Sequence, residues 1–418
     1  MSVAPKIASQ VGALVERVVF ATPAHDIHTH LYAPAFGRRL RWGIDELLTF
    51  HSLVAEGFRH WEMPYEKFWE LDLPTRAELI WTTLFVQRSP VSESCRHVLT
   101  ALSALGVDLR NRDLASIRRW YASHQVDGLL LRVMDLAGVR TICMANSPFD
   151  AEGRAVWERG TAPDRRFTTA LRIDDLLHDW PAAARALDGW GYRTDGGLTP
   201  ATFAAVRRFL ADWSRRIDPL YLFAALPPEF DYPGNTTAAR LLDGAVLPHC
   251  AETNRPLALI PGVRRAVNPG LQDAGDTAER IPLAPYERLV GSHPQHKFLF
   301  TVLARENQHE ACVLARKFRN VHLFGCPWLA AVPSLMEEAA RLRVELLGLS
   351  MTPHYSNARV LEHLIARWRD ARRVVADVLK SKYLALAAAG WEVGEAEVAR
   401  DAGALFGGAF EAFLQRKL

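Results

Sequence analysis

The chain has 418 residues, of which 49% are hydrophobic and 23% charged, and it carries a formal net charge of +3. This composition is typical of a globular protein with room for a large core. Lysine and arginine are spread along the chain rather than grouped in blocks, so we expect no nucleic-acid partner.

The cysteines and the apolar segments bear on the compartment. Five cysteines are widely spaced and form no Cys-x-x-Cys, which argues against a disulfide framework and against a zinc ribbon. They are Cys95, Cys143, Cys250, Cys312 and Cys326. No stretch reaches the roughly 18 apolar residues that span a bilayer, and Glu16 and Arg17 interrupt the first apolar pattern, unlike the core of a signal peptide. We therefore expect a cytoplasmic protein with no membrane partner.

The first predicted strand is the apolar run at residues 24–31, which contains His28-Thr29-His30. Side chains two apart on a strand point to the same face, so His28 and His30 project together. Two imidazoles side by side on a rigid strand can chelate a divalent metal. The alternative is a pair of polar residues at a strand end, each hydrogen-bonded to a neighbour.

Residues 32–138 follow this strand and are predicted to be mostly helical. Apolar residues recur at helical spacing over Leu47–Trp61, Arg76–Leu84 and Ser92–Leu105. We interpret this segment as a helical insertion at the active face of the fold, where it would serve as a lid or a pocket wall.

From residue 139 onward, short apolar runs rich in β-formers alternate with helical segments. The runs are Val139–Asn146, Arg166–Ile173, Leu220–Leu226, Leu257–Pro261, Lys297–Ala304, Val321–Cys326 and Leu346–Met351. The helical segments between them include Pro200–Ile217, Glu306–Phe318 and Ser334–Leu346. Alternation of strands and helices predicts a parallel sheet, and eight units predict a closed barrel.

The sequence thus predicts an α/β fold, a distorted (β/α)8 TIM barrel with an insertion after strand 1 and a helical C-terminal extension. Residues 1–31 would form an N-terminal helix and strand 1, and residues 32–138 the insertion. Residues 139–357 would supply strands 2–8. Residues 358–418 would pack as helices on the outside of the barrel, with a break at Ala389-Gly390.

In this fold the catalytic groups come from the C-terminal ends of the strands. Several arginines follow those ends, which points to an anionic, carboxylate-bearing ligand, although any one of them could form a structural salt bridge. No histidine ends strands five and six, which argues against a binuclear hydrolase centre. The Gly- and Pro-bearing loop Asn268–Thr277 follows a strand and is expected to shape the pocket.

Several segments carry a family resemblance. They are DIHTHL at 26–31, TFHSLVAE at 49–56, ALRIDD at 170–175, TVLARENQHEACVLARKFRNVHLFGC at 301–326 and SNARVLEHLIARW at 356–368. Through them the chain resembles the uronate (glucuronate) isomerase family, a branch of the amidohydrolase superfamily, over most of its length. The resemblance implies the same distorted barrel.

The resemblance also implies a set of site residues. A single divalent metal, with zinc as the expected ion, would be held by His28, His30 and Asn357. The catalytic residues would be His51, as the base, with Asn357 and Arg359. Substrate-binding residues would be Arg172, Arg359, Ser52 and Trp328. Arg305, which follows the sixth predicted strand, is a further substrate-binding candidate. The partner would be a small sugar acid or another carboxylated metabolite, and we also expect a homo-oligomer.

Two departures from the family pattern bear on the chemistry. The family has aspartate where this chain has Asn357, and tyrosine where it has Ser52. An asparagine ligates more weakly and cannot act as a general base, so the ion would be weakly held or absent. The first hypothesis is therefore an aldose–ketose isomerase acting by C2–C1 proton transfer. The alternatives are dehydration, C–C cleavage, decarboxylation or hydrolysis of a carboxylated metabolite, and a non-catalytic barrel that only binds ligand.

Overall fold

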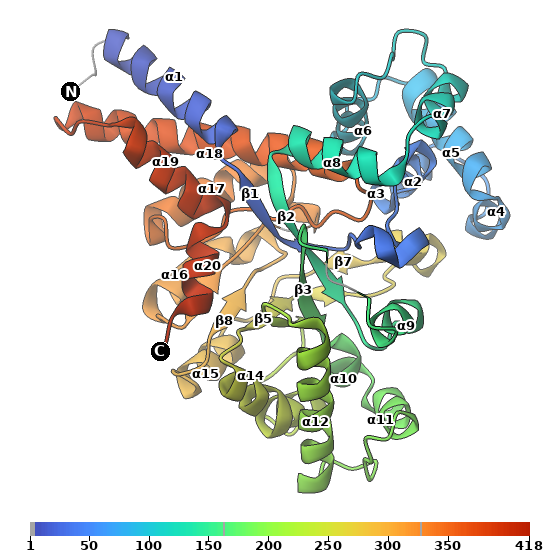
Figure 1. Ribbon diagram of the computed structural model, residues 1–418, viewed down its shortest axis with the longest axis vertical. Coiled ribbons are helices and arrows are strands. Elements are labelled where there is room, and N and C mark those ends of the chain that lie inside the picture. The colour runs from blue at the N-terminus through green and yellow to red at the C-terminus, as the bar shows by residue number, and fades with distance from the viewer. Residues whose placement is uncertain (1–4, 162–163, 327) are drawn as a thin grey trace.

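The computed structural model describes residues 5–161, 164–326 and 328–418. A curled sheet of seven parallel strands lies at its centre and is surrounded by helices (Figure 1). The strands follow one another across the sheet in chain order. They are β1 (Ala24–Thr29), β2 (Val139–Asn146), β3 (Phe167–Arg172), β4 (Leu222–Leu226), β5 (Leu257–Pro261), β8 (Phe298–Phe300) and β9 (Val321–Leu323). Each lies in a predicted apolar run, and nearly all of their residues are buried, as expected for a sheet covered on both faces.

The predicted eighth strand at Leu346–Met351 is wrong. Helix α17 (Pro333–Leu347) continues through its first two residues and ends at Gly348, whose positive φ of 62° suits a residue without a side chain. A single bridge between Phe324 and Thr352 takes the place of that strand. The barrel-like arrangement nevertheless continues on to β1, because the Asn357 N–H donates to the carbonyl of His28 (3.1 Å) and the His30 N–H donates to that of Ala358 (2.8 Å). An irregular segment, 352–358, therefore joins β9 to β1.

The helical insertion lies between β1 and β2. Figure 1 shows α4 to α7 on the side of the molecule away from both chain ends. Its helices are α2 (Ile44–Leu48), α3 (His51–Gly57), α4 (Tyr65–Glu70), α5 (Leu73–Trp81), α6 (Glu93–Ala104), α7 (Leu114–Ala122) and α8 (Val126–Ala137), with a 3-10 turn η1 (Pro34–Arg39) and a π turn η2 (Thr82–Val86). Ser92 and Asp113 begin α6 and α7 as N-caps, each accepting a backbone hydrogen bond.

The remaining helices cover the outside of the sheet or close its ends. Preceding β1 is α1 (Pro5–Ala21), and between the strands lie α9 (Ala151–Glu158), α10 (Asp174–His178), α11 (Trp180–Gly189), α12 (Pro200–Ile217), α13 (Thr237–Leu241), α14 (Leu247–Thr253), α15 (Ala284–Ser292), α16 (Gln308–Lys317) and α17. Short turns are η3 (Leu242–Val246), η5 (Arg305–Asn307) and η6 (Trp328–Ala330). After β5 comes a small hairpin of β6 (Val263–Arg264) and β7 (Thr277–Ala278) around η4 (Pro269–Gly275). The chain continues with α18 (His363–Ala388), α19 (Glu395–Gly403), η7 (Ala404–Gly408) and α20 (Ala409–Gln415).

The apolar residues form two cores. A large one fills the space between the strands and the outer helices, and a smaller one fills the barrel interior. The interior core includes Phe410 and Phe413 of α20, so this helix closes the end of the barrel where β1 begins. Gly407, with φ of 130°, sits against His25 of β1, and a side chain there would come within 2.8 Å of the His25 Cβ. Whereas α18 packs against the outer helices α1, α6, α8 and α17, α20 contributes to the interior.

The start of α18 is joined to the insertion by a buried carboxyl group. Glu362 accepts a hydrogen bond from the Gly43 N–H (2.8 Å). Burial raises the pKa of Glu362 to about 7, although the Gly43 bond acts in the opposite direction. The folded protein therefore holds a proton on Glu362 over a pH range in which the unfolded chain has already released it.

Among the described residues, none of the helices combines the length and the apolar composition that a bilayer crossing requires.

The raised pKa of Glu362 predicts a pH-dependent contribution to stability. Between pH 4.5, the ordinary pKa of glutamate, and about pH 7, the native state binds the proton and the unfolded state does not. The contribution of Glu362 to the free energy of unfolding should therefore fall by about 3 kcal/mol as the pH rises through this window, whereas the buried neutral histidines, such as His28 and His51, contribute in the opposite direction. The free energy of unfolding of the native chain minus that of Glu362→Gln should fall by this amount, as measured by urea unfolding of both chains at pH 5, 6, 7 and 8. The exposed control Glu338→Gln should show no such fall relative to the native chain; a difference between the native chain and Glu362→Gln that does not change with pH would contradict the assignment.

Candidate active site

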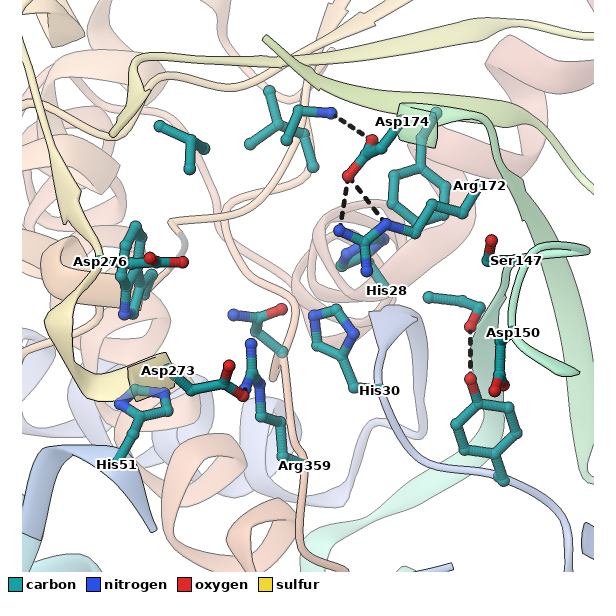
Figure 2. Close-up of a pocket in the computed structure, with 18 of the residues that line it drawn as sticks. His28, His30, His51, Ser147, Asp150, Arg172, Asp174, Asp273, Asp276 and Arg359 are labelled. Atoms are coloured by element: carbon teal, nitrogen blue, oxygen red, sulfur yellow. Dashed lines mark hydrogen bonds and ion pairs between the residues drawn. The ribbon is translucent and has the colours of Figure 1, made fainter. Parts of the chain in front are cut away.

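A cavity of about 560 Å³ opens where the C-terminal ends of the strands meet. This size lies within the range of small-molecule sites. Its walls come from β1, β3, the closing segment 352–358, the start of α3 and the hairpin around η4. The predicted site residues that line it are His28, His30, His51, Arg172, Trp328, Asn357 and Arg359. Figure 2 shows His30 at its centre, with Arg172 and Arg359 reaching toward it from two sides.

His28 of β1 and His30, which directly follows this strand, are neutral, and the tautomer of His28 is fixed by its neighbours. The Tyr221 hydroxyl donates to the carbonyl of Ile27 (2.7 Å), so it must accept from Nδ1 of His28 (2.9 Å). Nε2 of His28 therefore carries its lone pair and remains available to a ligand in the cavity. Burial lowers the pKa of His28 to about 3, and the Arg172 charge acts in the same direction. Burial also holds the pKa of His30 well below its ordinary value.

The donors at this pair fit a divalent ion, although weakly. The two rings lie 5.6 Å apart between centroids and meet edge to face. The side chain of Asn357 interacts with His30, and its backbone adopts φ of 51°, a conformation that asparagine tolerates better than most residues. Two neutral imidazoles and an amide oxygen are acceptable zinc donors. No carboxylate joins them in the described part of the chain, and two guanidinium groups stand close by, so the affinity should be low.

Arg172 is held rigidly by an acidic neighbour. Its Nε and Nη2 donate to Oδ2 of Asp174 at 2.8 and 2.5 Å, and Oδ1 of Asp174 accepts from the Ala225 N–H of β4 at 2.8 Å. Burial lowers the pKa of Arg172, but the contact with Asp174 outweighs it and the pKa ends raised. The guanidinium is therefore charged, oriented and left with free N–H groups for a ligand.

Arg359 is held less firmly. Its Nη1 contacts Oδ2 of Asp273 on η4 at 3.0 Å, and the Asp273 side chain is 82% exposed. Burial lowers the pKa of Arg359, and Asp273 acts against that shift. Since a surface ion pair of this kind is weak, a ligand carboxylate can take the place of Asp273 on Arg359.

His51 begins α3 and faces the cavity next to Arg359 (Figure 2). Burial lowers its pKa to about 3, with Arg359 and Arg367 adding to the effect. Ser52 does not line the cavity; its hydroxyl lies 3.3 Å from Nδ1 of His51. Successive side chains of a helix point about 100° apart, so Ser52 does not face the cavity together with His51, and this placement does not support its predicted contact with substrate.

Arg305 is also placed differently from the prediction. It begins η5, its side chain is 60% exposed, and its Nε contacts Oε2 of Glu338 on α17 at 3.0 Å. The turn after β8 carries it away from the cavity, which it does not line. It therefore no longer belongs among the substrate-binding candidates. Trp328, by contrast, lines the cavity with φ of 53°.

The cavity also holds charged residues beyond the predicted Arg172 and Arg359. With these two included, it is lined by six arginines and five carboxylates: Arg38, Arg39, Arg41, Arg172, Arg265, Arg359, Asp150, Glu152, Asp174, Asp273 and Asp276. Asp273 and Asp276 belong to the loop Asn268–Thr277, which the sequence singled out only as a wall. Arg39 pairs with Asp150 at 2.6 Å across 111 residues of chain. The excess of arginine over acid favours an anionic ligand.

Known proteins resemble this chain at the level of solved structures. No protein-family model matches the sequence, and no curated protein sequence matches it. Among solved structures, a uronate isomerase from Bacillus halodurans is 42% identical with a TM-score of 0.97, and the match covers 100% of this chain and 98% of that one. A uronate isomerase from Thermotoga maritima (TM-score 0.76, 96% of this chain and 97% of that one) and a glucuronate isomerase from Caulobacter crescentus (TM-score 0.77, 100% and 96%) are each 14% identical.

The two distant matches show that the barrel with its insertion and extension is shared. The match to the Bacillus halodurans protein goes further, because 42% identity runs over the whole of both chains. On that evidence the chain belongs to the uronate isomerase family.

Proposed function

We propose that this protein is a uronate isomerase that interconverts the aldose and ketose forms of a sugar acid by proton transfer between C2 and C1. The observation that carries the proposal is that His51, Arg172 and Arg359 line the same cavity as His28 and His30. It is found in a chain that is 42% identical to a uronate isomerase over its full length. A carboxylate anchor, a neutral imidazole and hydrogen-bond donors are what this chemistry needs.

Binding begins with the substrate carboxylate. Arg359 takes it in place of the exposed Asp273, and Arg172 adds N–H donors from the opposite side of His30. Guanidinium groups pair with carboxylates through two parallel hydrogen bonds. This contact fixes the sugar acid end to end, so that its C2 and C1 lie against the histidines.

His51 then takes the C2 proton. Because the pKa of His51 is about 3 in the empty site, the ring is neutral at every physiological pH. A substrate carboxylate on Arg359 offsets one of the charges that lower this pKa, which makes His51 a stronger base once substrate is bound. The Asn357 amide and the Arg172 guanidinium donate hydrogen bonds to the developing enediolate oxygen. His51 returns the proton at C1, and the proton of the C2 hydroxyl passes to O1, so that C2 becomes the ketone of the product.

A divalent metal, with zinc as the candidate, would be held by His28, His30 and Asn357. When bound it would polarise the carbonyl oxygen of the substrate.

The free cysteines are compatible with a reducing cytoplasm, and a homo-oligomer stays a prediction.

One observation favours a second function. Asn357 supplies no carboxylate beside His30, and His51, the residue proposed as the base, has a pKa of about 3. A site with so weak a base suits reactions in which the anchored carboxylate itself takes part, such as decarboxylation, as well as dehydration, C–C cleavage or hydrolysis. The second candidate is therefore another reaction on a carboxylated metabolite in the same cavity.

The two candidates are separated by proton exchange. The protein is incubated in D₂O with glucuronate or galacturonate and with Zn²⁺, and the C2 proton is followed by NMR together with formation of the ketose. The isomerase assignment predicts both exchange and ketose. If the native chain shows neither, whereas Asn357→Asp shows both, the native site is built for a different reaction and the proposal fails.

A further inference from the structure

A cluster of three metal-binding side chains lies outside the barrel mouth, where α6 of the insertion packs against α18. Glu93 and His97 lie four residues apart on one face of α6, and Asp370 faces them from α18. Nε2 of His97 is 3.4 Å from Oε1 of Glu93 and 2.9 Å from Oδ2 of Asp370. The side chains are only 13%, 22% and 17% exposed for His97, Glu93 and Asp370.

These separations match those between ligands of one ion. Zinc lies about 2.0–2.2 Å from imidazole nitrogen and carboxylate oxygen, so two ligand atoms on the same ion lie roughly 3–3.5 Å apart. All three donor atoms lie within 4.8 Å of one another. One imidazole and two carboxylates also neutralise a divalent charge, which the all-neutral donors at the barrel mouth do not.

The surroundings include a further imidazole without a partner. His354 is 2% exposed, and within the described ranges neither of its ring nitrogens has a hydrogen-bond partner. Its pKa is lowered to about 3 by burial and then by Arg367, while Asp370 acts in the opposite direction and His97 adds to the lowering. His354 is therefore a neutral imidazole that interacts with two members of the triad. Arg96 competes for one of the carboxylates, with its Nη1 3.8 Å from Oε2 of Glu93.

We propose that Glu93, His97 and Asp370 form a second divalent-metal site, of the zinc class, which joins the helical insertion to the C-terminal helix. The ion would link α6 to the helix that begins just after Asn357 and Arg359. It would therefore hold the insertion in place over the cavity rather than take part in the chemistry. This proposal does not depend on which reaction the cavity performs.

The test separates this site from the barrel mouth. The double variant His28→Ala/His30→Ala lacks the imidazole ligands of the mouth and is stripped of metal with a chelator. Zn²⁺ is then added, and metal content after dialysis and the unfolding temperature are measured; Co²⁺ absorption reports the ligand field. We expect one bound equivalent per chain and a rise of several degrees in the unfolding temperature.

Adding His97→Gln to this background should weaken Zn²⁺ binding about 100-fold and remove the temperature rise. Asp370→Asn serves as a second variant with nearly unchanged volume and should behave in the same way. If the double variant binds no zinc, or if binding survives both substitutions, the site does not exist. A loss of stability in His97→Gln that is the same with and without Zn²⁺ would show an ion pair in place of a metal site and would overturn the proposal.

Discussion

His51→Asn is expected to slow C2 proton exchange by about 10³-fold and to leave the KM for the sugar acid within a few-fold of the native value. A positioned general base contributes roughly 10²- to 10⁴-fold, and asparagine keeps a similar shape without basicity. Ser52→Ala is the matched control, because Ser52 contacts His51 and does not line the cavity. It should reduce the rate by less than tenfold. Full exchange in His51→Asn would remove His51 from the mechanism.

The pH profile provides a second check on the same residue. A base works when it is unprotonated, and the pKa of His51 in the empty site is about 3. The kcat/KM attributable to His51 should therefore stay flat from pH 8 down to about pH 5 and fall only as the ring gains a proton below that. An inflection near pH 6.5 that disappears in His51→Asn would contradict the burial that sets this pKa.

Arg359→Lys is expected to lower kcat/KM by about 10²- to 10³-fold, mainly through a higher KM. Removing one partner of a buried, hydrogen-bonded charge pair costs about 2–5 kcal/mol, and lysine keeps the charge but loses the two-pronged contact with a carboxylate. The measurement is steady-state kinetics on the sugar acid, together with binding of its ketose product.

Two control variants accompany Arg359→Lys. Asp273→Asn removes the acid that pairs with Arg359 in the empty site and should leave the KM unchanged or lower it. Arg305→Lys changes an exposed arginine outside the cavity and should have no effect. If Arg359→Lys binds the sugar acid normally, or if Asp273→Asn weakens binding as strongly, Arg359 is not the carboxylate anchor.

The sequence predicted most of the barrel because its seven strands lie in short runs rich in apolar and β-forming residues, as expected for strands that are buried on both faces of a parallel sheet. It failed at the eighth position, where the apolar residues of Leu346–Met351 belong to the end of α17 and the barrel closes through irregular backbone at 352–358. Backbone hydrogen bonds in irregular segments, such as that from the Asn357 N–H to the His28 carbonyl, follow no sequence periodicity. They therefore cannot be predicted from a pattern in the chain.

The candidate site could likewise be predicted only in part. His28, Arg172 and Arg359 could be predicted to meet because the ends of neighbouring parallel strands meet. The acids that orient the arginines could be predicted only in part: Asp174 follows its arginine in the chain, whereas Asp273 reaches Arg359 from a loop 86 residues away. Arg305 and Ser52 do not line the cavity. The direction of the Arg305 side chain is set by the turn after β8, and that of Ser52 by its position in the turn of α3; neither follows from knowing where the strands end.

The closure of the barrel by α20 bears on the order in which the protein folds during its synthesis. Phe410 and Phe413 seal the interior that also contains Tyr221, and Tyr221 fixes the tautomer of His28. The surroundings of His28 in β1 therefore depend on residues of α20, which are synthesised long after it. Before α20 is made, the apolar interior lacks this cover, and we expect the site to reach its final geometry only after α20 has packed against the barrel.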